Sequence, residues 1–182
     1  NTVKENDQIA SAMQPLQWEI DQAVVEATPE SASFAPQFHP LEQAFTDART
    51  ADQMAAVLAR QTVLKAAVDK DLAANACGHA VPGGKVLVLS LSAQEMVAYQ
   101  DGCAVRGTPI TTGRPQLPTP TGTYHVFYKT TPFTMVSPWD KPSPFWYPTT
   151  TVTWVMEFIG GGYFIHDADW EAPGDYGPGS QN

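Results

Sequence analysis

One histidine stands at the end of a short, regular segment near the C-terminus. Three glycines at 160–162 are followed by Tyr163, Phe164 and Ile165, and then by His166. This order predicts a turn that leads into a short buried strand with His166 at its far end. Histidine exchanges protons near neutral pH, so His166 is a candidate for acid–base chemistry. The alternative is a structural histidine whose ring nitrogens are satisfied by hydrogen bonds.

Other chemically active residue types form weaker patterns. The histidines lack metal-ligand spacing such as HExxH and the cysteines form no cluster, so we predict no metal site. Asp167, Asp169 and Glu171 are paired carboxylates of the kind glycosidases use, but a solvated turn explains them better. The glycines at 160–162 open no helix, which argues against a phosphate loop and favours close approach of the backbone to a ligand. We predict no cofactor.

The composition indicates an acidic globular chain. It has 182 residues, of which 43% are hydrophobic and 16% charged, with a net charge of -9. An acidic surface is not drawn to phosphates, so nucleic acid and anionic membranes are not expected partners. No apolar run reaches the roughly 18 residues that a membrane span needs. The chain starts at Asn1 rather than at methionine, which we interpret as a mature or trimmed form.

Residues 1–82 are expected to be a lead segment followed by a helical region. Prolines should interrupt any helix attempted near residues 8–25 and in the segment that follows: Pro15, Pro29, Pro36 and Pro40. Thr50 and Gln53 have the spacing of a capping box, and apolar residues then recur at helical spacing to Leu72. We therefore predict a helix over 50–76, packed on a helix around 41–48 or on the domain that follows.

The pattern changes to strands after residue 84. Strands are predicted at 85–91, 95–100, 103–110, 123–129, 151–158 and 163–166. Asp101 and Gly102 form a hairpin turn, and Tyr124 is expected in the core. The fold class is mainly β, an antiparallel sandwich or partly closed barrel over 84–182, behind the helical N-terminal region. The loop 135–148, rich in proline and aromatic residues, either packs on itself or forms a lid over a cleft.

The two cysteines allow two interpretations. Cys77 and Cys103 would be joined most simply as a disulfide in an exported protein, with Cα atoms about 4.4 to 6.8 Å apart. Such a bond would stabilise the fold by roughly 3 kcal/mol. The competing interpretation is a nucleophile in Cys77-Gly78-His79, where a base two residues away in a loop is weak support.

Three segments in order carry a resemblance to one family. They are the first strand, which ends in a Ser-Leu-Ser-like run at 90–92, the Pro-Thr-Pro-Thr-Gly turn at 118–122, and the histidine segment at 165–170. Together they resemble an L,D-transpeptidase catalytic domain of the YkuD family. The resemblance implies the same β fold, export to the cell wall, and acyl transfer between peptidoglycan stem peptides by a cysteine nucleophile. It implies that His166 is the general base.

The resemblance also implies substrate contacts at Tyr147, Gly161 and Gly162, with Trp146 as an alternative stacking group. These residues and the loop 135–148 should border the cleft that His166 faces. The family carries its cysteine in a Ser/Thr-His-Gly-Cys motif after the histidine, and 177–182 is similar to the approach to it. We therefore expect the nucleophile beyond Asn182. The alternative is a catalytically inactive wall-binding module that keeps the cleft and lacks the cysteine.

Overall fold

The computed structural model describes residues 2–172, 175–177 and 180, with side chains described from Ile9 onward. The chain divides into two compact units. The first unit is Asn1–Thr112 with Tyr176–Asn182, and the second unit is Gly113–Asp175.

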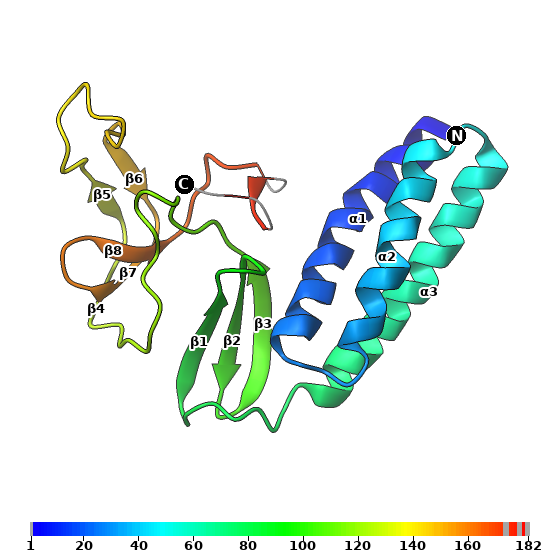
Figure 1. The fold of residues 1–182 in the computed structure, drawn as a ribbon, viewed down its shortest axis with the longest axis horizontal. Coiled ribbons are helices and arrows are strands. Elements are labelled where there is room, and N and C mark those ends of the chain that lie inside the picture. The colour runs from blue at the N-terminus through cyan, green and yellow to red at the C-terminus, as the bar shows by residue number, and fades with distance from the viewer. Residues whose placement is uncertain (1, 173–174, 178–179, 181–182) are drawn as a thin grey trace. The chain divides into compact units, whose positions relative to one another are not determined.

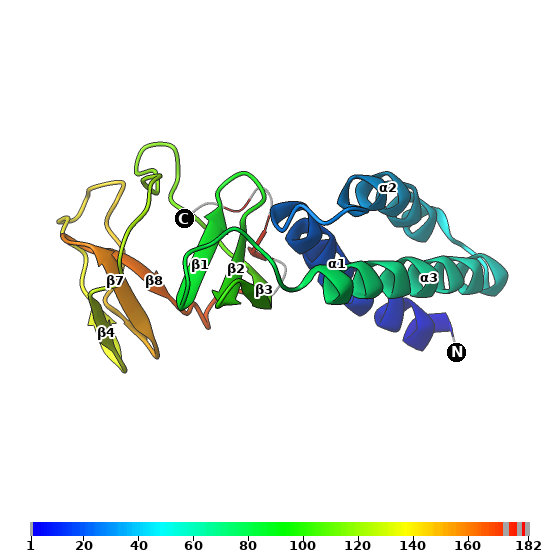
Figure 2. The same cartoon turned by 90° about the horizontal axis from the view of Figure 1, so that it is seen from below.

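Three helices open the first unit, and Figures 1 and 2 show them side by side. They are α1 (Thr2–Val25), α2 (Ser31–Asp47) and α3 (Ala51–Asn75). Each turns an apolar stripe inward, because residues three or four apart share one face of a helix. The bundle core is contributed by all three helices: Ile9, Met13, Leu16, Ile20, Ala23, Phe34, Phe38, Leu41, Met54, Val57, Leu64 and Val68.

The prediction that prolines interrupt the N-terminal segment was wrong. Pro15 lies inside α1, and Pro36 and Pro40 lie inside α2. A proline in a helix interior costs about 3 kcal/mol. Burying one large apolar side chain stabilises by about 1.5 to 3 kcal/mol, and α1 buries four of them along one stripe. Tertiary packing therefore outweighs the local penalty.

The capping box that begins α3 is confirmed. Thr50 Oγ1 accepts the amide hydrogen of Gln53 at 3.2 Å, and Gln53 Oε1 accepts the amide hydrogen of Thr50 at 3.1 Å. These reciprocal bonds satisfy two of the donors that a helix start leaves open. The observed helix begins and ends within one residue of the predicted range.

The first unit also contains an antiparallel sheet in the order β1 (Lys85–Ser90), β2 (Glu95–Gln100) and β3 (Cys103–Pro109). All three strands agree closely with the predicted ranges. Asp101 and Gly102 have φ of 52° and 81°, so they form the predicted hairpin turn. Helix α1 packs against β2 and β3. It comes so close at Gly107 that a Cβ atom there would collide with the Gln22 side chain.

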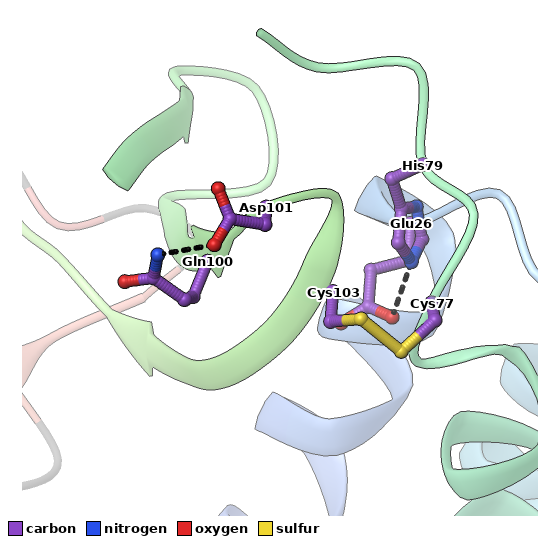
Figure 3. Close-up of a disulfide and its surroundings, with 6 residues drawn as sticks. All are labelled: Glu26, Cys77, His79, Gln100, Asp101 and Cys103. Carbon is purple, nitrogen blue, oxygen red and sulfur yellow. Dashed lines mark hydrogen bonds and ion pairs between the residues drawn. A yellow bond between two sulfur atoms is a disulfide. The ribbon is translucent and has the colours of Figure 1, made fainter. Parts of the chain in front are cut away.

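A disulfide between Cys77 and Cys103 joins the end of α3 to the start of β3, as predicted (Figure 3). The Cα atoms are 3.9 Å apart, closer than we expected. The reason is that the two cysteines face each other as a pair between antiparallel segments, where Cα atoms approach to about 4.5 Å. The Ala104 amide donates to the Ala76 carbonyl on one side, and the His79 amide donates to the Gly102 carbonyl on the other.

The described residues of the second unit form five short strands. One sheet has the order β4 (Tyr128–Thr130), β7 (Val155–Ile159) and β8 (Tyr163–His166), and a separate hairpin pairs β5 (Phe133–Met135) with β6 (Thr150–Val152). The strand predicted at 123–129 is reduced to its last residues. Tyr124 is 39% exposed, so its predicted place in the core was wrong. Its hydroxyl donates to the Thr121 carbonyl within the same turn.

The predicted fold class needs a correction. The described part of the chain is a mixture of three helices and eight strands, and its antiparallel sheets do not close into a barrel. Antiparallel pairing and the helical N-terminal region were predicted correctly. Helices α1 and α2 account for most of the difference, because the prolines had concealed them. Over the described residues, no helix combines the length and the hydropathy needed to cross a membrane.

Candidate active site

The glycine turn delivers His166 to the end of β8, as the sequence predicted. Gly161 and Gly162 have φ of 94° and 101°, a backbone region that side chains disfavour, and they connect β7 to β8. His166 pairs with Val155 across the two strands. Since cross-strand partners share one face of a sheet, the half-buried imidazole lies on the same side as the buried Val155 side chain.

The hydrogen bonding of His166 fixes the tautomer of its ring. Nδ1 lies 2.8 Å from the backbone carbonyl oxygen of Asp167. A carbonyl oxygen only accepts, so Nδ1 carries the hydrogen and Nε2 of the neutral ring keeps a lone pair. No hydrogen bond joins Nε2 to any residue in the described part of the chain. A ring held in this way has one nitrogen for orientation and one for proton transfer.

The carboxylate of Asp167 points away from this chemistry. It accepts the amide hydrogens of Thr153 at 3.0 Å and Trp154 at 2.5 Å. Burial acts to raise the pKa of Asp167, but these amide donors outweigh it and hold the pKa below the usual value. Asp167 therefore orients His166 through its backbone carbonyl, and its side chain is not part of a triad.

A cleft of about 600 Å³ lies beside His166. Three neighbouring segments line it, at 129–131, 154–156 and 165–167. Apolar surface comes from Met156 and Ile165, and Trp154 at the wall is 63% exposed. Pockets of this kind bind a ligand through apolar walls and a few polar groups.

The cleft contains residues that the sequence analysis did not single out. Lys129 and Thr130 stand on β4, which pairs with β7 through Lys129↔Met156 and Thr130↔Val155. The sequence predicted a strand at 123–129 that includes Lys129. It did not predict which strand pairs with it, so it could not place these residues beside β7. A single cation at this wall suits a carboxylate-bearing ligand.

Of the substrate contacts inferred from the resemblance, none lines this cleft. Gly161 and Gly162 belong to the turn at the other end of β8, and Tyr147 lies in the loop between β5 and β6. A Cβ atom at Gly161 would meet nothing within 4 Å, and one at Gly162 would meet only Phe164 at 3.9 Å. The turn therefore presents bare backbone on an open side.

The loop at 136–149 is held by contacts within itself. Tyr147 Oη donates to the Val136 carbonyl at 3.1 Å, which closes the two ends, and burial raises the pKa of Tyr147. The Trp139 and Phe145 rings lie 5.7 Å apart, and the Lys141 ammonium lies 4.0 Å from the centre of the Trp146 ring. Of the two interpretations, packing on itself agrees with these contacts.

Neither cysteine is a thiol. Cys77 and Cys103 are bonded to each other, and the described residues include no free cysteine. The nucleophile considered in Cys77-Gly78-His79 is therefore excluded while the bond is intact, and the His79 imidazole faces Glu26 instead. In the segment at 177–182, residues 178–179 and 181–182 lie outside the described residues. No group of three or more potential metal ligands occurs in the described ranges.

These features define a β domain that presents a histidine at the end of a strand, beside a cleft. The sequence profile of the YkuD family, described as the L,D-transpeptidase catalytic domain, matches residues 84–181. The chain belongs to this family, as the motifs indicated. Its members are acyltransferases that act on peptidoglycan.

Comparison with individual proteins adds one solved structure. The crystal structure of Mycobacterium tuberculosis L,D-transpeptidase 1 is similar, with 26% identity and a TM-score of 0.44. The match covers 47% of this chain and 46% of that one, so less than half of either protein is compared. No curated protein matches the chain.

Proposed function

We propose that this chain is the histidine-bearing part of a peptidoglycan L,D-transpeptidase, and that His166 is its general base. One observation carries the proposal: Nδ1 is fixed by the Asp167 carbonyl, and Nε2 has no hydrogen-bond partner among the described residues, at the wall of a cleft. A neutral imidazole of this tautomer accepts a proton at Nε2 without moving its ring.

The reaction would run in two acyl transfers. A thiol gives its proton to Nε2, and the thiolate attacks the carbonyl of the third residue of a donor stem peptide. The imidazolium then gives the proton to the amine of the terminal D-alanine as that bond breaks. In the second transfer, a side-chain amine of another stem attacks the thioester and His166 takes the proton of that amine. The carbon–sulfur bond breaks, which releases the thiolate and leaves the two stems joined by a new amide bond.

We propose that the nucleophilic cysteine lies beyond Asn182. The reasoning is chemical: both cysteines of these residues are consumed by a disulfide, and a disulfide sulfur is not a thiolate. The thiol must approach Nε2 to about 3 Å for proton transfer.

For substrate binding we propose two sets of groups. The open backbone at Gly161 and Gly162 would let a donor peptide approach closely, and the Tyr147 ring, with Trp146 as the alternative, would stack on it. Within the cleft, Lys129 would hold a stem carboxylate and Trp154 would cover its apolar part. The catalytic domain would begin near residue 84, where the family match starts, behind the helical region of residues 1–82.

We propose that the protein works outside the cytoplasm. Its family substrate is the cell wall, and disulfides such as Cys77–Cys103 persist in oxidising compartments.

The test uses the protein extended through the residues that follow Asn182. It is incubated with disaccharide-tetrapeptides, and the products are analysed by mass spectrometry. A cross-linked dimer with one equivalent of released D-alanine per bond supports the proposal. Hydrolysis or cross-linking that persists after His166→Gln contradicts the role of His166 as the base.

The alternative function is a wall-binding module without catalysis. It is favoured by the presence of His166 and a cleft in a chain whose cysteines are both bonded. Co-sedimentation of the extended protein with purified cell walls, without any cross-linked product, would establish this alternative.

A further inference from the structure

The contact between α1 and the β1–β2–β3 sheet buries carboxyl groups. Strand β2 alternates, so Glu95, Val97 and Tyr99 share one face, and they are 1%, 0% and 4% exposed. Helix α1 packs on β2 and β3, with Gln22 against Gly107. Two of the three inward positions of β2 are therefore ionisable side chains at a buried junction.

Glu95 has little to compensate its burial. Its Oε1 has no hydrogen-bond partner in the described structure, and the amide of Thr108 is the backbone donor to its carboxyl group. The charge that acts on it is the like charge of Asp21 on α1, whose Oδ2 also lacks a partner among the described residues. Burial, and then the Asp21 charge, raise the pKa of Glu95 to about 8.

A second carboxyl group lies at the other end of the same contact. Glu26 Oε1 accepts a hydrogen bond from Gln22, and Oε2 lies 3.4 Å from Nε2 of His79 (Figure 3). The His79 ring packs against Tyr99, with ring centres 4.9 Å apart. Burial raises the pKa of Glu26, and burial together with the Glu26 charge raises the pKa of Tyr99 to about 12.

Positive charge is scarce around these acids. The charges that face them are those of His79 from the segment after α3 and of His39 from α2, which attracts Asp21. Lys65 of α3 pairs with Glu19 and Asp69 instead. No lysine or arginine of the described ranges forms an ion pair with Glu95, Asp21 or Glu26.

We propose that this contact is a proton-gated joint, which is closed while Glu95 carries a proton and opens when Glu95 loses it. A carboxylate in that position would be a buried charge with a like charge as neighbour, which is costly. Separation of α1 from β2 exposes the carboxylates of Glu95 and Asp21 to water.

The disulfide determines which end of the joint opens. Cys103 follows β2 at the hairpin turn, next to Gln100, whereas Glu95 begins β2. The five residue steps from Glu95 to Gln100, the residue paired with Cys103, span roughly 17 Å of strand. The Cys77–Cys103 bond and the Glu26–His79 pair hold the hairpin end together, so the Glu95 end opens and the bundle stays attached (Figure 3).

The pH dependence follows from proton binding. Between the ordinary pKa of glutamate and about 8, the closed joint binds one proton that the open joint releases. The opening equilibrium therefore rises about tenfold per pH unit in that range and levels off above it.

Hydroxyl-radical footprinting of the 182-residue protein tests this between pH 5.5 and 9. Oxidation of Val97, the inward residue nearest Glu95 and 0% exposed, is measured relative to Val126, which is 40% exposed. We expect the ratio to rise about tenfold per pH unit up to pH 8 while Phe34 in the bundle core stays protected. Glu95→Gln, a permanently neutral isostere, should abolish the rise above pH 6. Glu30→Gln, at an exposed carboxylate, should keep it.

A Glu95→Gln protein with the wild-type rise overturns the proposal, and so does parallel exposure of Phe34, which would mean global unfolding. Asp21→Asn keeps the test decisive if Glu95→Gln fails to fold. With the like charge removed, the pKa of Glu95 in the closed joint is raised less, so the rise in Val97 oxidation should level off at a lower pH and reach a smaller total. An unchanged midpoint and amplitude in Asp21→Asn overturn the joint as well.

Discussion

Asp167 and Trp154 are joined by two hydrogen bonds. The Asp167 carboxylate accepts the Trp154 amide hydrogen at 2.5 Å, and the Asp167 amide donates to the Trp154 carbonyl at 3.4 Å. Together they attach the end of β8 to the start of β7. Because the carbonyl of Asp167 holds Nδ1 of His166, the position of the imidazole depends on this attachment.

Asp167→Asn should lower the free energy of unfolding by about 1 to 2 kcal/mol at pH 7, since it weakens charge-assisted bonds that solvent partly screens. The folded-state pKa of Asp167 is lowered, so its contribution is present above the ordinary aspartate pKa and is lost as pH falls through the folded value. Urea unfolding at pH 7 and pH 3 measures this. Asp169→Asn, at an exposed neighbour, is the matched control.

His166→Ala should abolish acylation in the extended protein while leaving the fold intact, because a half-buried ring contributes little packing. Intact-mass measurement of the adduct with a carbapenem reports acylation, and circular dichroism reports folding. His125→Ala replaces an exposed histidine of the same unit and should react like the wild type. Equal loss in both variants would remove the special role of His166.

The Cys77→Ser/Cys103→Ser double variant should lose about 3 to 4 kcal/mol of stability, because the bond closes a sequence separation of 26 residues. Urea unfolding with and without dithiothreitol measures the loss. The wild type should fall to the stability of the double variant in dithiothreitol, and the double variant should not respond. Wild-type stability that is indifferent to reduction would show that the bond does not contribute.

Pro15→Ala should raise the free energy of unfolding by about 1 to 3 kcal/mol, because it restores a backbone donor and removes a steric conflict inside α1. Pro29→Ala is the comparison, since Pro29 lies in the turn between α1 and α2, where a fixed φ is no penalty. Thermal denaturation of both variants and the wild type measures the two changes in stability. A Pro15→Ala protein that is less stable than the wild type contradicts the argument.

Local signals in the sequence predicted those elements that local chemistry determines. The capping box at Thr50, the hairpin turn at Asp101 and the glycine turn before β8 each depend on neighbouring residues, and each was found where expected. The disulfide also followed from a simple rule, the pairing of an even number of cysteines in an exported protein.

The remaining features depend on partners that are distant in the chain. The prolines of α1 and α2 are tolerated because each helix buries an apolar stripe against the other helices, and no local rule detects that packing. The walls of the cleft, including Lys129, result from a pairing register between β4 and β7. Tyr124 was misplaced for a related reason, since alternation was applied to a segment that is not a strand.

The hydrogen bond from Tyr147 to the Val136 carbonyl closes the loop at 136–149, and this closure has a consequence for binding. A loop that is braced by its own aromatic contacts has already lost most of its conformational entropy before any ligand arrives. A ligand that binds such a preorganised loop avoids the loss of conformational entropy that ordering a flexible segment would cost. The loop would then move as one body about its two ends, in the manner of an Ω-loop.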